Sequence, residues 1–163
     1  MTCYSMASPI GTISISASED ALESIDWLGR AADHDPAPAH PLLVEAAAQL
    51  NAYFGGRLAD FDLPLAPKST KRGNELRDAI IAIPYGEVAS YGEVARRADS
   101  GPRAIGQACQ RNPLPIIVPC HRVIAARGKI GYYSGGEGVS TKCLLLNHEL
   151  QNTSEEDRDL WAA

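Results

Sequence analysis

The sequence predicts an α+β protein: a small N-terminal antiparallel sheet with a covering helix, then a C-terminal winged-helix-like (helix-turn-helix) domain. Residues 10–16 and 22–28 alternate apolar and polar side chains, as half-buried strands do. Residues 41–54 carry an apolar stripe at helical spacing. Further along, two short helical segments flank a turn at 99–102, which is the arrangement of a helix-turn-helix.

The N-terminal elements are predicted from periodicity and from turn residues. The first strand alternates isoleucine with small polar residues, and the turn at 18–20 lets residues 22–28 pair with it in antiparallel order. Residues 61–65 are expected to extend this sheet. The helix begins at Pro41 and stops before Gly55-Gly56, and its apolar stripe must cover the sheet.

A linker at 65–70 divides the chain, so we predict a structural domain at 1–66, a winged-helix-like domain at 67–150, and an acidic tail at 151–163. Charge follows the same division. The first part has two basic and nine acidic side chains, a net of −7, whereas the second has twelve basic and seven acidic, a net of +5. The positive part therefore has an electrostatic reason to approach the phosphates of nucleic acid, although the whole chain has a net charge of −5.

Capping and turn residues predict the elements of the C-terminal domain. Ser90 and Glu93 form a capping box that opens a helix ending at Ala98. The second helix, at 103–111, turns Ile105, Ala108 and Cys109 inward and keeps its other face small. The remaining predicted elements are a helix at 75–83, a β-hairpin around 127–129 as the wing, a glycine-rich loop at 131–138 and a closing helix at 140–150.

Cys120 and His121 stand side by side after an apolar run and Pro119, an arrangement that places a thiol at a fixed point. Neighbouring side chains diverge in helices and strands, so we expect a water molecule, not a direct contact, to link the thiol to the imidazole. Positive charge on Arg122 and His121 should favour the thiolate, which is the nucleophile. The alternative is an inert buried cysteine beside a structural histidine.

Composition and cysteine spacing limit the class of protein. A chain of 163 residues with 45% hydrophobic content can bury a core. No apolar run approaches the ~18 residues of a membrane span, so we expect a soluble, cytoplasmic protein. The four cysteines form no Cys-x-x-Cys pair and indicate free thiols. Cys3, His34 and His40 lack the paired spacing of a zinc site, so no metal is expected.

Three motifs carry a resemblance to a known family. They are Ile83-Pro84-Tyr85-Gly86-Glu87-Val88, then Asn112-Pro113 with Pro119-Cys120-His121-Arg122-Val123, and finally Tyr133-Ser134-Gly135-Gly136. Over residues 83–149 the chain resembles the O6-alkylguanine-DNA alkyltransferases, the methylated-DNA–protein-cysteine methyltransferases. The resemblance implies repair of double-stranded DNA by base flipping and a single transfer of an alkyl group from O6-alkylguanine to the protein itself. O4-alkylthymine is a second candidate substrate.

The resemblance also assigns roles to residues. Cys120 accepts the alkyl group, His121 activates it through water, Glu149 orients His121, and Tyr91 assists protonation of the guanine. The implied DNA-contacting residues are Tyr91, Pro102, Arg103, Ala104, Gly106 and Gln107, with Arg103 intercalating from the minor groove. The implied pocket residues are Asn112, Val123, Tyr133, Ser134 and Lys142, with the carbonyls of Cys120 and Val123 reading the guanine amino group.

The expected protein is a monomer that needs no cofactor, because the thiolate displaces guanine directly. Two residues more than in many relatives lie between Gly136 and Lys142, which affects the loop over the pocket. Three alternatives stay open: a non-catalytic module that binds alkyl lesions, a cysteine-dependent hydrolase, and a winged-helix transcription factor.

Overall fold

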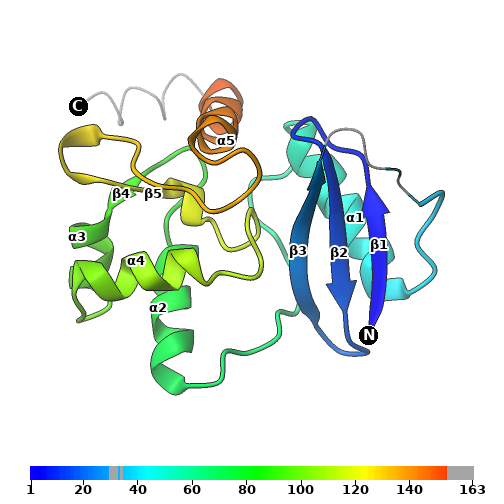
Figure 1. The fold of residues 1–163 in the computed structure, drawn as a ribbon, viewed down its shortest axis with the longest axis horizontal. Helices are drawn as coiled ribbons and strands as arrows, with labels where there is room; N and C mark the ends of the chain where they lie inside the picture. Colours follow the sequence, from blue (N-terminus) through cyan, green and yellow to red (C-terminus); the bar gives the residue numbers. More distant parts are fainter. Residues whose placement is uncertain (30–32, 34, 154–163) are drawn as a thin grey trace. The chain divides into compact units, whose positions relative to one another are not determined.

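The computed structural model describes residues 1–29, 33 and 35–153. Contacts between Cα atoms divide the chain into two compact units, Met1–Pro67 and a second unit that starts at Lys68. Figure 1 shows a three-stranded sheet with one helix in the first unit, and helices around a short two-stranded sheet in the second. None of the described helices combines the length and apolar character needed to cross a bilayer.

The sheet of the first unit is antiparallel, with the order β1 (Thr2–Met6), β2 (Thr12–Ala17), β3 (Leu22–Gly29). The alternation predicted for β2 is confirmed, because Ile13 and Ile15 are fully buried. The strand starts two residues later than predicted, since Gly11 adopts a φ of 105° in a turn closed on Ser8. β1 was not predicted, because its side chains do not alternate clearly between buried and exposed.

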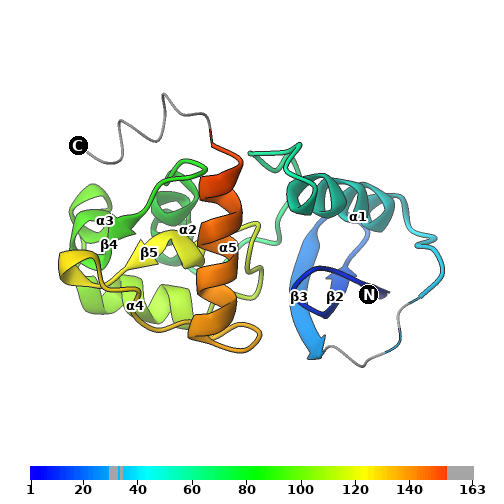
Figure 2. The same cartoon turned by 90° about the horizontal axis from the view of Figure 1, so that it is seen from above.

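Helix α1 (Pro41–Phe54) covers this sheet and has the predicted bounds. The His40 side chain caps its first turn, Leu43, Leu50 and Tyr53 are buried, and the helix packs against β1 and β2 (Figure 2). The predicted extension of the sheet by residues 61–65 is limited to Leu65. Only a single parallel bridge joins Leu65 to Leu22, because the neighbouring Pro64 has no N–H with which to continue a ladder.

The second unit contains the predicted helix-turn-helix, made of α3 (Tyr91–Arg97) and α4 (Pro102–Gln110), which pack against each other. Both halves of the Ser90–Glu93 capping box are present. The preceding helix, α2 (Lys71–Ile81), begins four residues earlier than predicted. The reason is the Thr70 side chain, which accepts a hydrogen bond from the N–H of Gly73 and so starts the helix there.

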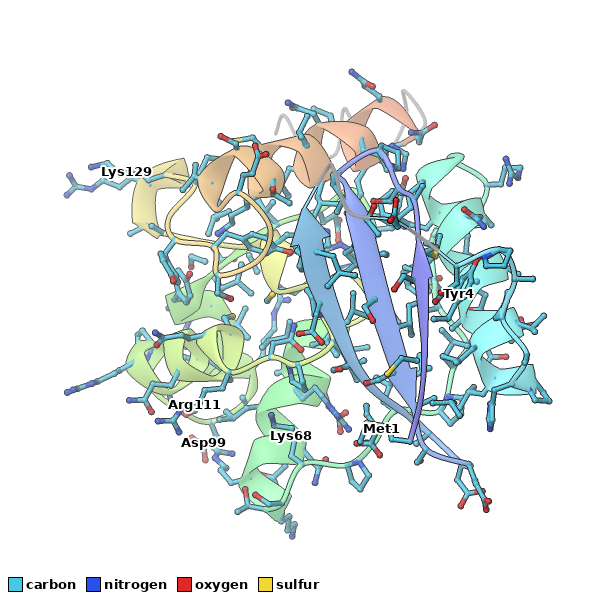
Figure 3. The ribbon with its side chains drawn as sticks, turned by 45° about the vertical axis from the view of Figure 1, so that its right-hand side comes forward. Met1, Tyr4, Lys68, Asp99, Arg111 and Lys129 are labelled. Atoms are coloured by element: carbon cyan, nitrogen blue, oxygen red, sulfur yellow. The ribbon has the colours of Figure 1, made fainter. Side chains whose placement is uncertain are left out.

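The predicted β-hairpin around residues 127–129 is wrong. Strand β5 (Val123–Ile124) pairs instead in parallel with β4 (Ala89–Ser90), and a 3₁₀ turn, η2 (Ala126–Gly128), follows it. Arg127 and Gly128 both have positive φ in this turn, which the Ala125 N–H closes on the Lys129 carbonyl. Residues 127–129, which carry the basic side chains of Arg127 and Lys129, therefore form a turn without strand pairing. Figure 3 shows Lys129 projecting from this turn.

The predicted glycine-rich loop at 131–138 is confirmed, and the last helix of the described residues is α5 (Val139–Gln151). Gln151, predicted as the first residue of the tail, is helical. Residues 154–163, including Trp161, lie outside the described part of the chain.

Candidate active site

A tight turn at residues 114–118 delivers Cys120 to the start of a 3₁₀ helix, η1 (Cys120–Arg122). The Val118 N–H donates to the Leu114 carbonyl at 2.9 Å and closes the turn. Within it the buried Ile116 adopts a φ of 75°, a left-handed conformation that a β-branched residue rarely takes. Such strain persists only where surrounding contacts enforce it.

The side chain of Asn112 supplies those contacts. Its Oδ1 accepts from the Leu114 N–H at 3.0 Å, while its Nδ2 donates to the Val118 carbonyl at 3.0 Å and to the Cys120 Sγ at 3.3 Å. One amide thus holds both ends of the turn and contacts the thiol. Asn112 was expected as a pocket residue, and its contact with Cys120 was not predicted.

Cys120 is only 5% exposed, and burial raises the pKa of its thiol. The Asn112 hydrogen bond and the charge of Lys142 act in the opposite direction and favour the thiolate, but they do not outweigh burial. We expected charge on Arg122 and His121 to favour the thiolate, but the charges of these two side chains are not among the causes that lower the pKa of Cys120. Arg122 faces a carboxylate instead, and His121 is held neutral.

Glu149, on α5, anchors a buried network on the other side of the reactive loop. Its Oε2 lies 2.5 Å from the His121 Nε2, and its Oε1 accepts from the Arg122 Nε at 2.8 Å and from the Gly86 N–H at 3.2 Å. Arg122 also donates to the Ile83 carbonyl at 2.8 Å and stacks over Tyr85. The contact between Glu149 and His121 is the one that the predicted orienting role requires, whereas the contacts of Arg122 with Glu149 and the Ile83 carbonyl were not predicted.

Burial and charge balance explain the ionisation of this network. Burial opposes ionisation of Glu149, but the hydrogen bonds and charges of His121 and Arg122 win and hold its pKa far below the usual range. Burial lowers the pKa of His121, since Arg122 already neutralises Glu149 and a second buried cation would be unpaired. A carboxylate only accepts, so Nε2 of the neutral His121 carries the proton. Nδ1 is then the basic nitrogen, and it has no hydrogen-bond partner within the described residues.

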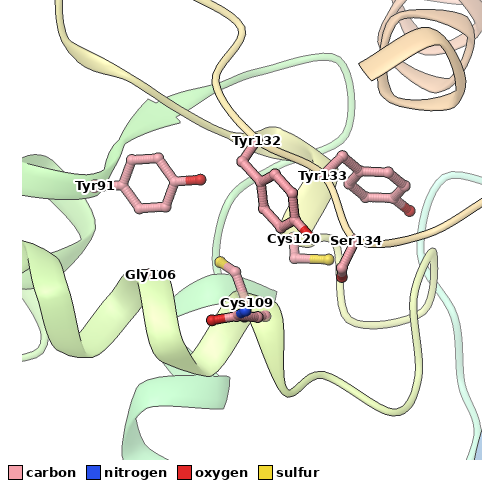
Figure 4. A pocket seen from close by; sticks show the side chains of 8 residues that line it. Tyr91, Gly106, Cys109, Cys120, Tyr132, Tyr133 and Ser134 are labelled. Carbon is pink, nitrogen blue, oxygen red and sulfur yellow. The ribbon is translucent and has the colours of Figure 1, made fainter. Parts of the chain in front are cut away.

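A small cavity of about 20 Å³ opens beside Cys120 (Figure 4). Of the predicted site residues, it brings together Tyr91, Gly106, Cys120, Tyr133 and Ser134. Three further residues line it that were not predicted to do so: Cys109, Gln110 and Tyr132. Cys109 was predicted as an inward-facing residue of its helix, but a helical pattern alone does not show which cavity that face meets.

Lys142 and Val123 are not among the residues that line this cavity. Lys142 is fully buried, and its Nζ donates to the Val123 carbonyl at 2.7 Å and to the Tyr132 carbonyl at 3.1 Å. Burial lowers its pKa. The two carbonyls predicted to read guanine are therefore engaged within the protein, because that of Cys120 accepts from the Val123 N–H. Lys142 ties β5 to the glycine-rich loop.

The outer face of α4 carries the residues expected to meet DNA. Pro102, Arg103 and Gln107 are exposed, and Ala104 and Gly106 are partly so. A Cβ atom at Gly106 would meet nothing within 4 Å, and its φ is not positive. Glycine inside a helix costs about 1 kcal/mol relative to alanine. No contact within the described residues requires a glycine at position 106. The missing side chain therefore suits the close approach of another molecule to this face of α4.

No cluster of three metal-ligating side chains occurs among residues 1–29, 33 and 35–153. Of the three zinc candidates, Cys3 is exposed, and the His40 Nδ1 accepts from the Leu42 N–H as a helix cap. His34 lies outside the described residues.

The fold and the site define an α+β protein in which a helix-turn-helix stands beside a buried cysteine with a His–Glu pair. Two family models cover nearly the whole chain: the ribonuclease-like domain of 6-O-methylguanine DNA methyltransferase matches residues 1–67, and its DNA-binding domain matches residues 73–151. The chain belongs to the 6-O-methylguanine DNA methyltransferase family.

Individual relatives agree with this assignment. A methylated-DNA–protein-cysteine methyltransferase of Methanosarcina acetivorans is 41% identical over 85% of this chain and 93% of its own length. One from Mycobacterium leprae is 38% identical over 90% and 91%, respectively. Among solved structures, Mycobacterium tuberculosis OGT in complex with DNA is similar with a TM-score of 0.79 and 36% identity, over 93% of this chain and 94% of that one.

Proposed function

We propose that this protein repairs double-stranded DNA by moving the alkyl group of an O6-alkylguanine to Cys120, once per molecule. The observation that carries the proposal is the position of Cys120, which lines a cavity bordered by α4 of the helix-turn-helix and accepts a hydrogen bond from Asn112. The names of the relatives, and the DNA complex of the M. tuberculosis structure, support the same activity.

The chemistry begins with the proton of Cys120. Because the resting thiol is protonated and His121 is neutral, the proton passes through a water molecule to Nδ1 of His121, and Glu149 stabilises the resulting imidazolium. Asn112 stabilises the thiolate as it forms. Glu149 and Asn112 thus stabilise the charges of the transition state more than they stabilise the resting protein, which lowers the barrier to transfer.

The thiolate then attacks the alkyl carbon. A carbon–sulfur bond forms, the carbon–oxygen bond breaks, and its electron pair returns to the guanine, which takes up a proton. Tyr91 is the proposed proton donor, since it lines the cavity and burial raises its pKa, so that it stays protonated at neutral pH. The product thioether is stable, which makes the protein a single-use reagent without a cofactor.

The target carbon lies inside the duplex, so the nucleotide must leave the base stack first, at a cost of a few kcal/mol. We assign this step to α4, lying in the minor groove. Gly106 and Ala104 allow the backbone to approach closely, Pro102 and Gln107 face the groove, and Arg103 fills the space left by the base. Tyr133 and Ser134 hold the alkyl group, and Asn112, Val123 and Lys142 support the pocket from outside its lining.

The proposal includes a monomer acting in the cytoplasm on DNA that contains alkylated guanine. Four-fifths of the basic side chains, twelve of fifteen, belong to residues 67–150, the part that carries α4 and Cys120. This distribution suits a partner with a dense negative charge.

A labelled substrate tests the proposal. A duplex with a radiolabelled methyl group on one O6-methylguanine should transfer the label to the wild-type protein and to Cys143→Ala, but not to Cys120→Ala. The Cys120→Ala variant should still bind the lesion duplex, because the contacts of α4 remain. Label on the Cys120→Ala protein, or lesion binding by the wild type without any transfer, would contradict the proposal.

A further inference from the structure

We propose that Cys109 sets the size of the alkyl group that this protein accepts, and that methyl is accepted in preference to benzyl-sized groups. The inference rests on the proposed transfer to Cys120 and names the substrate range of that same site. It follows from three features of the cavity: its volume, the rigidity of the α4 wall, and the chemical inertness of Cys109.

The cavity beside Cys120 is small. Its volume of about 20 Å³, the space open to the centre of a water molecule, holds little more than one water. A methyl group is of that size, whereas a benzyl group is several times larger. Figure 4 shows Cys109, from α4, and Cys120, from η1, on the same side-chain-lined space.

The cavity has one wall in a loop and one wall on helices. Tyr132, Tyr133 and Ser134 belong to the glycine-rich segment, in which Gly131, Gly136 and Gly138 adopt positive φ. Tyr132 is 64% exposed, so it can turn away at little cost. A guanine base is much larger than the resting cavity, so this loop wall must yield when the base enters.

The helical wall stays in place during that movement. Gly106, Cys109 and Gln110 lie on α4, which packs against α2 and α3 and buries Ile105 completely. Gly106 has no side chain, and the Gln110 side chain is exposed and can turn toward solvent. The buried side chain of Cys109 is therefore the fixed bulk of this wall. Close-packed interiors accommodate extra methylene groups poorly when the wall cannot move.

Cys109 contributes volume, not reactivity. Burial, followed by the neighbouring Cys120, raises the pKa of its thiol to about 12, so it is protonated at neutral pH and does not compete as a nucleophile. It is 9% exposed. The space that its Sγ fills should therefore decide how large a group can attach to Cys120.

The test compares two duplexes that differ only in carrying O6-methylguanine or O6-benzylguanine. The ratio of the two second-order rates cancels the active fraction of each protein preparation. We expect the wild type to favour methyl by about 10-fold or more, the scale of discrimination by misfit in an apolar pocket. Cys109→Ala should reduce that ratio by about 3- to 10-fold. Cys109→Val, which fills at least as much space without a thiol, should keep the ratio at the wild-type value or above it, and the control Cys143→Ala should keep it within about twofold of the wild type.

Three results would overturn the inference: a wild type that reacts equally fast with both lesions, a Cys109→Ala ratio equal to that of the wild type, or a Cys109→Val ratio that falls as far as that of Cys109→Ala. The last would mean that the thiol acts chemically. In each case methyl transfer to Cys120 would still stand. A wild type that accepts neither group on Cys120 would instead defeat the proposed function itself.

Discussion

At the scale of single residues, Asn112 has two roles: it fixes the backbone of the reactive loop and it contacts the reactive thiol. It holds the turn that contains the strained Ile116 and donates to the thiol that the turn presents. Strain in that turn costs about 1–3 kcal/mol, so the loop keeps this conformation only while the hydrogen bonds of Asn112 hold it. Position and reactivity of Cys120 should therefore change together when Asn112 is replaced.

Asn112→Ala should slow alkyl transfer by about 10- to 100-fold, since a hydrogen bond to a charged group contributes about 1.5–3 kcal/mol. The pKa of Cys120 should rise, because the Asn112 hydrogen bond favours the thiolate. The rise of rate with pH should therefore shift to higher pH. Rates on free O6-methylguanine across pH, with melting curves to confirm folding, check this. A slower variant with an unshifted pH profile would mean that Asn112 serves only the loop.

The ionisation of His121 predicts how stability responds to acid. Its pKa is lowered in the folded protein, so unfolding takes up a proton at pH values below the ordinary histidine pKa of about 6.5. The free energy of unfolding should thus fall from pH 7 to pH 5, by up to about 1.4 kcal/mol per pH unit. Glu149, whose pKa is also lowered, adds a loss of the same sign below about pH 4.5.

Chemical denaturation at several pH values measures this slope. His121→Gln keeps an amide donor for Glu149 but removes the titration, so its slope between pH 7 and pH 5 should be flatter. An equal slope in wild type and His121→Gln would show that His121 is not the group responsible.

The sequence allowed the reactive residues to be named more reliably than the contacts that they make. Cys120, His121 and Glu149 could be named because a motif fixes their types and spacing, and the structure brings His121 and Glu149 together. Arg122 was assigned to the thiol because it is near in sequence. Its real partners, Glu149 and the Ile83 carbonyl, are distant in the chain and depend on how α5 packs on η1.

At the scale of elements, α4 combines a buried inner face with an outer face of small and basic residues. Ile105 and Cys109 are buried, while Arg103 stands exposed in the first turn. Local signals, namely the capping box and the turn predicted at 99–102, placed the ends of the two helices to within one residue, although Pro102 belongs to α4 and not to the turn. The wing could not be predicted in the same way, because β5 pairs with β4 from a distant part of the sequence and leaves residues 126–128 as an isolated turn.

Arg103→Ala should weaken repair of duplex DNA far more than reaction with free O6-methylguanine, because only the duplex requires base extrusion. We expect a loss of about 10-fold or more on the duplex, corresponding to the few kcal/mol of unstacking, and less than about twofold on the free base. Arg57→Ala, which removes an equal charge from the first unit, is the matched control and should react like the wild type on both. Equal losses on both substrates would show that Arg103 serves the fold.

At the scale of the whole molecule, the described cavity and the Glu149 network belong entirely to the second unit, which also holds the basic excess. The reaction consumes this unit, because the alkyl group stays on a buried side chain. Its effect on stability should depend on size, since the cavity beside Cys120 has room for about one water molecule.

Alkylated protein should therefore melt at a lower temperature, slightly for a methyl group and by several degrees for a benzyl group. Overpacking costs about 1–3 kcal/mol, and each kcal/mol lowers Tm by about 2–4 °C in a chain of this length. Hydrogen exchange should increase around residues 103–123, where alkylation disturbs the hydrogen bond from Asn112 to the Cys120 thiol. Protein incubated with unmodified duplex is the control. Equal or higher stability of the benzylated form would show that the site accommodates the group without strain.

The most direct test of the central claim is the intact mass of the protein after incubation with an excess of O6-methylguanine duplex. The account predicts that every active molecule gains one methyl group in place of one proton, that peptide mapping places it on Cys120, and that the lesion is consumed one for one. Unmodified protein that consumes many lesions would indicate a hydrolase. Unmodified protein beside an intact lesion would indicate a binding module, and either result would contradict the account.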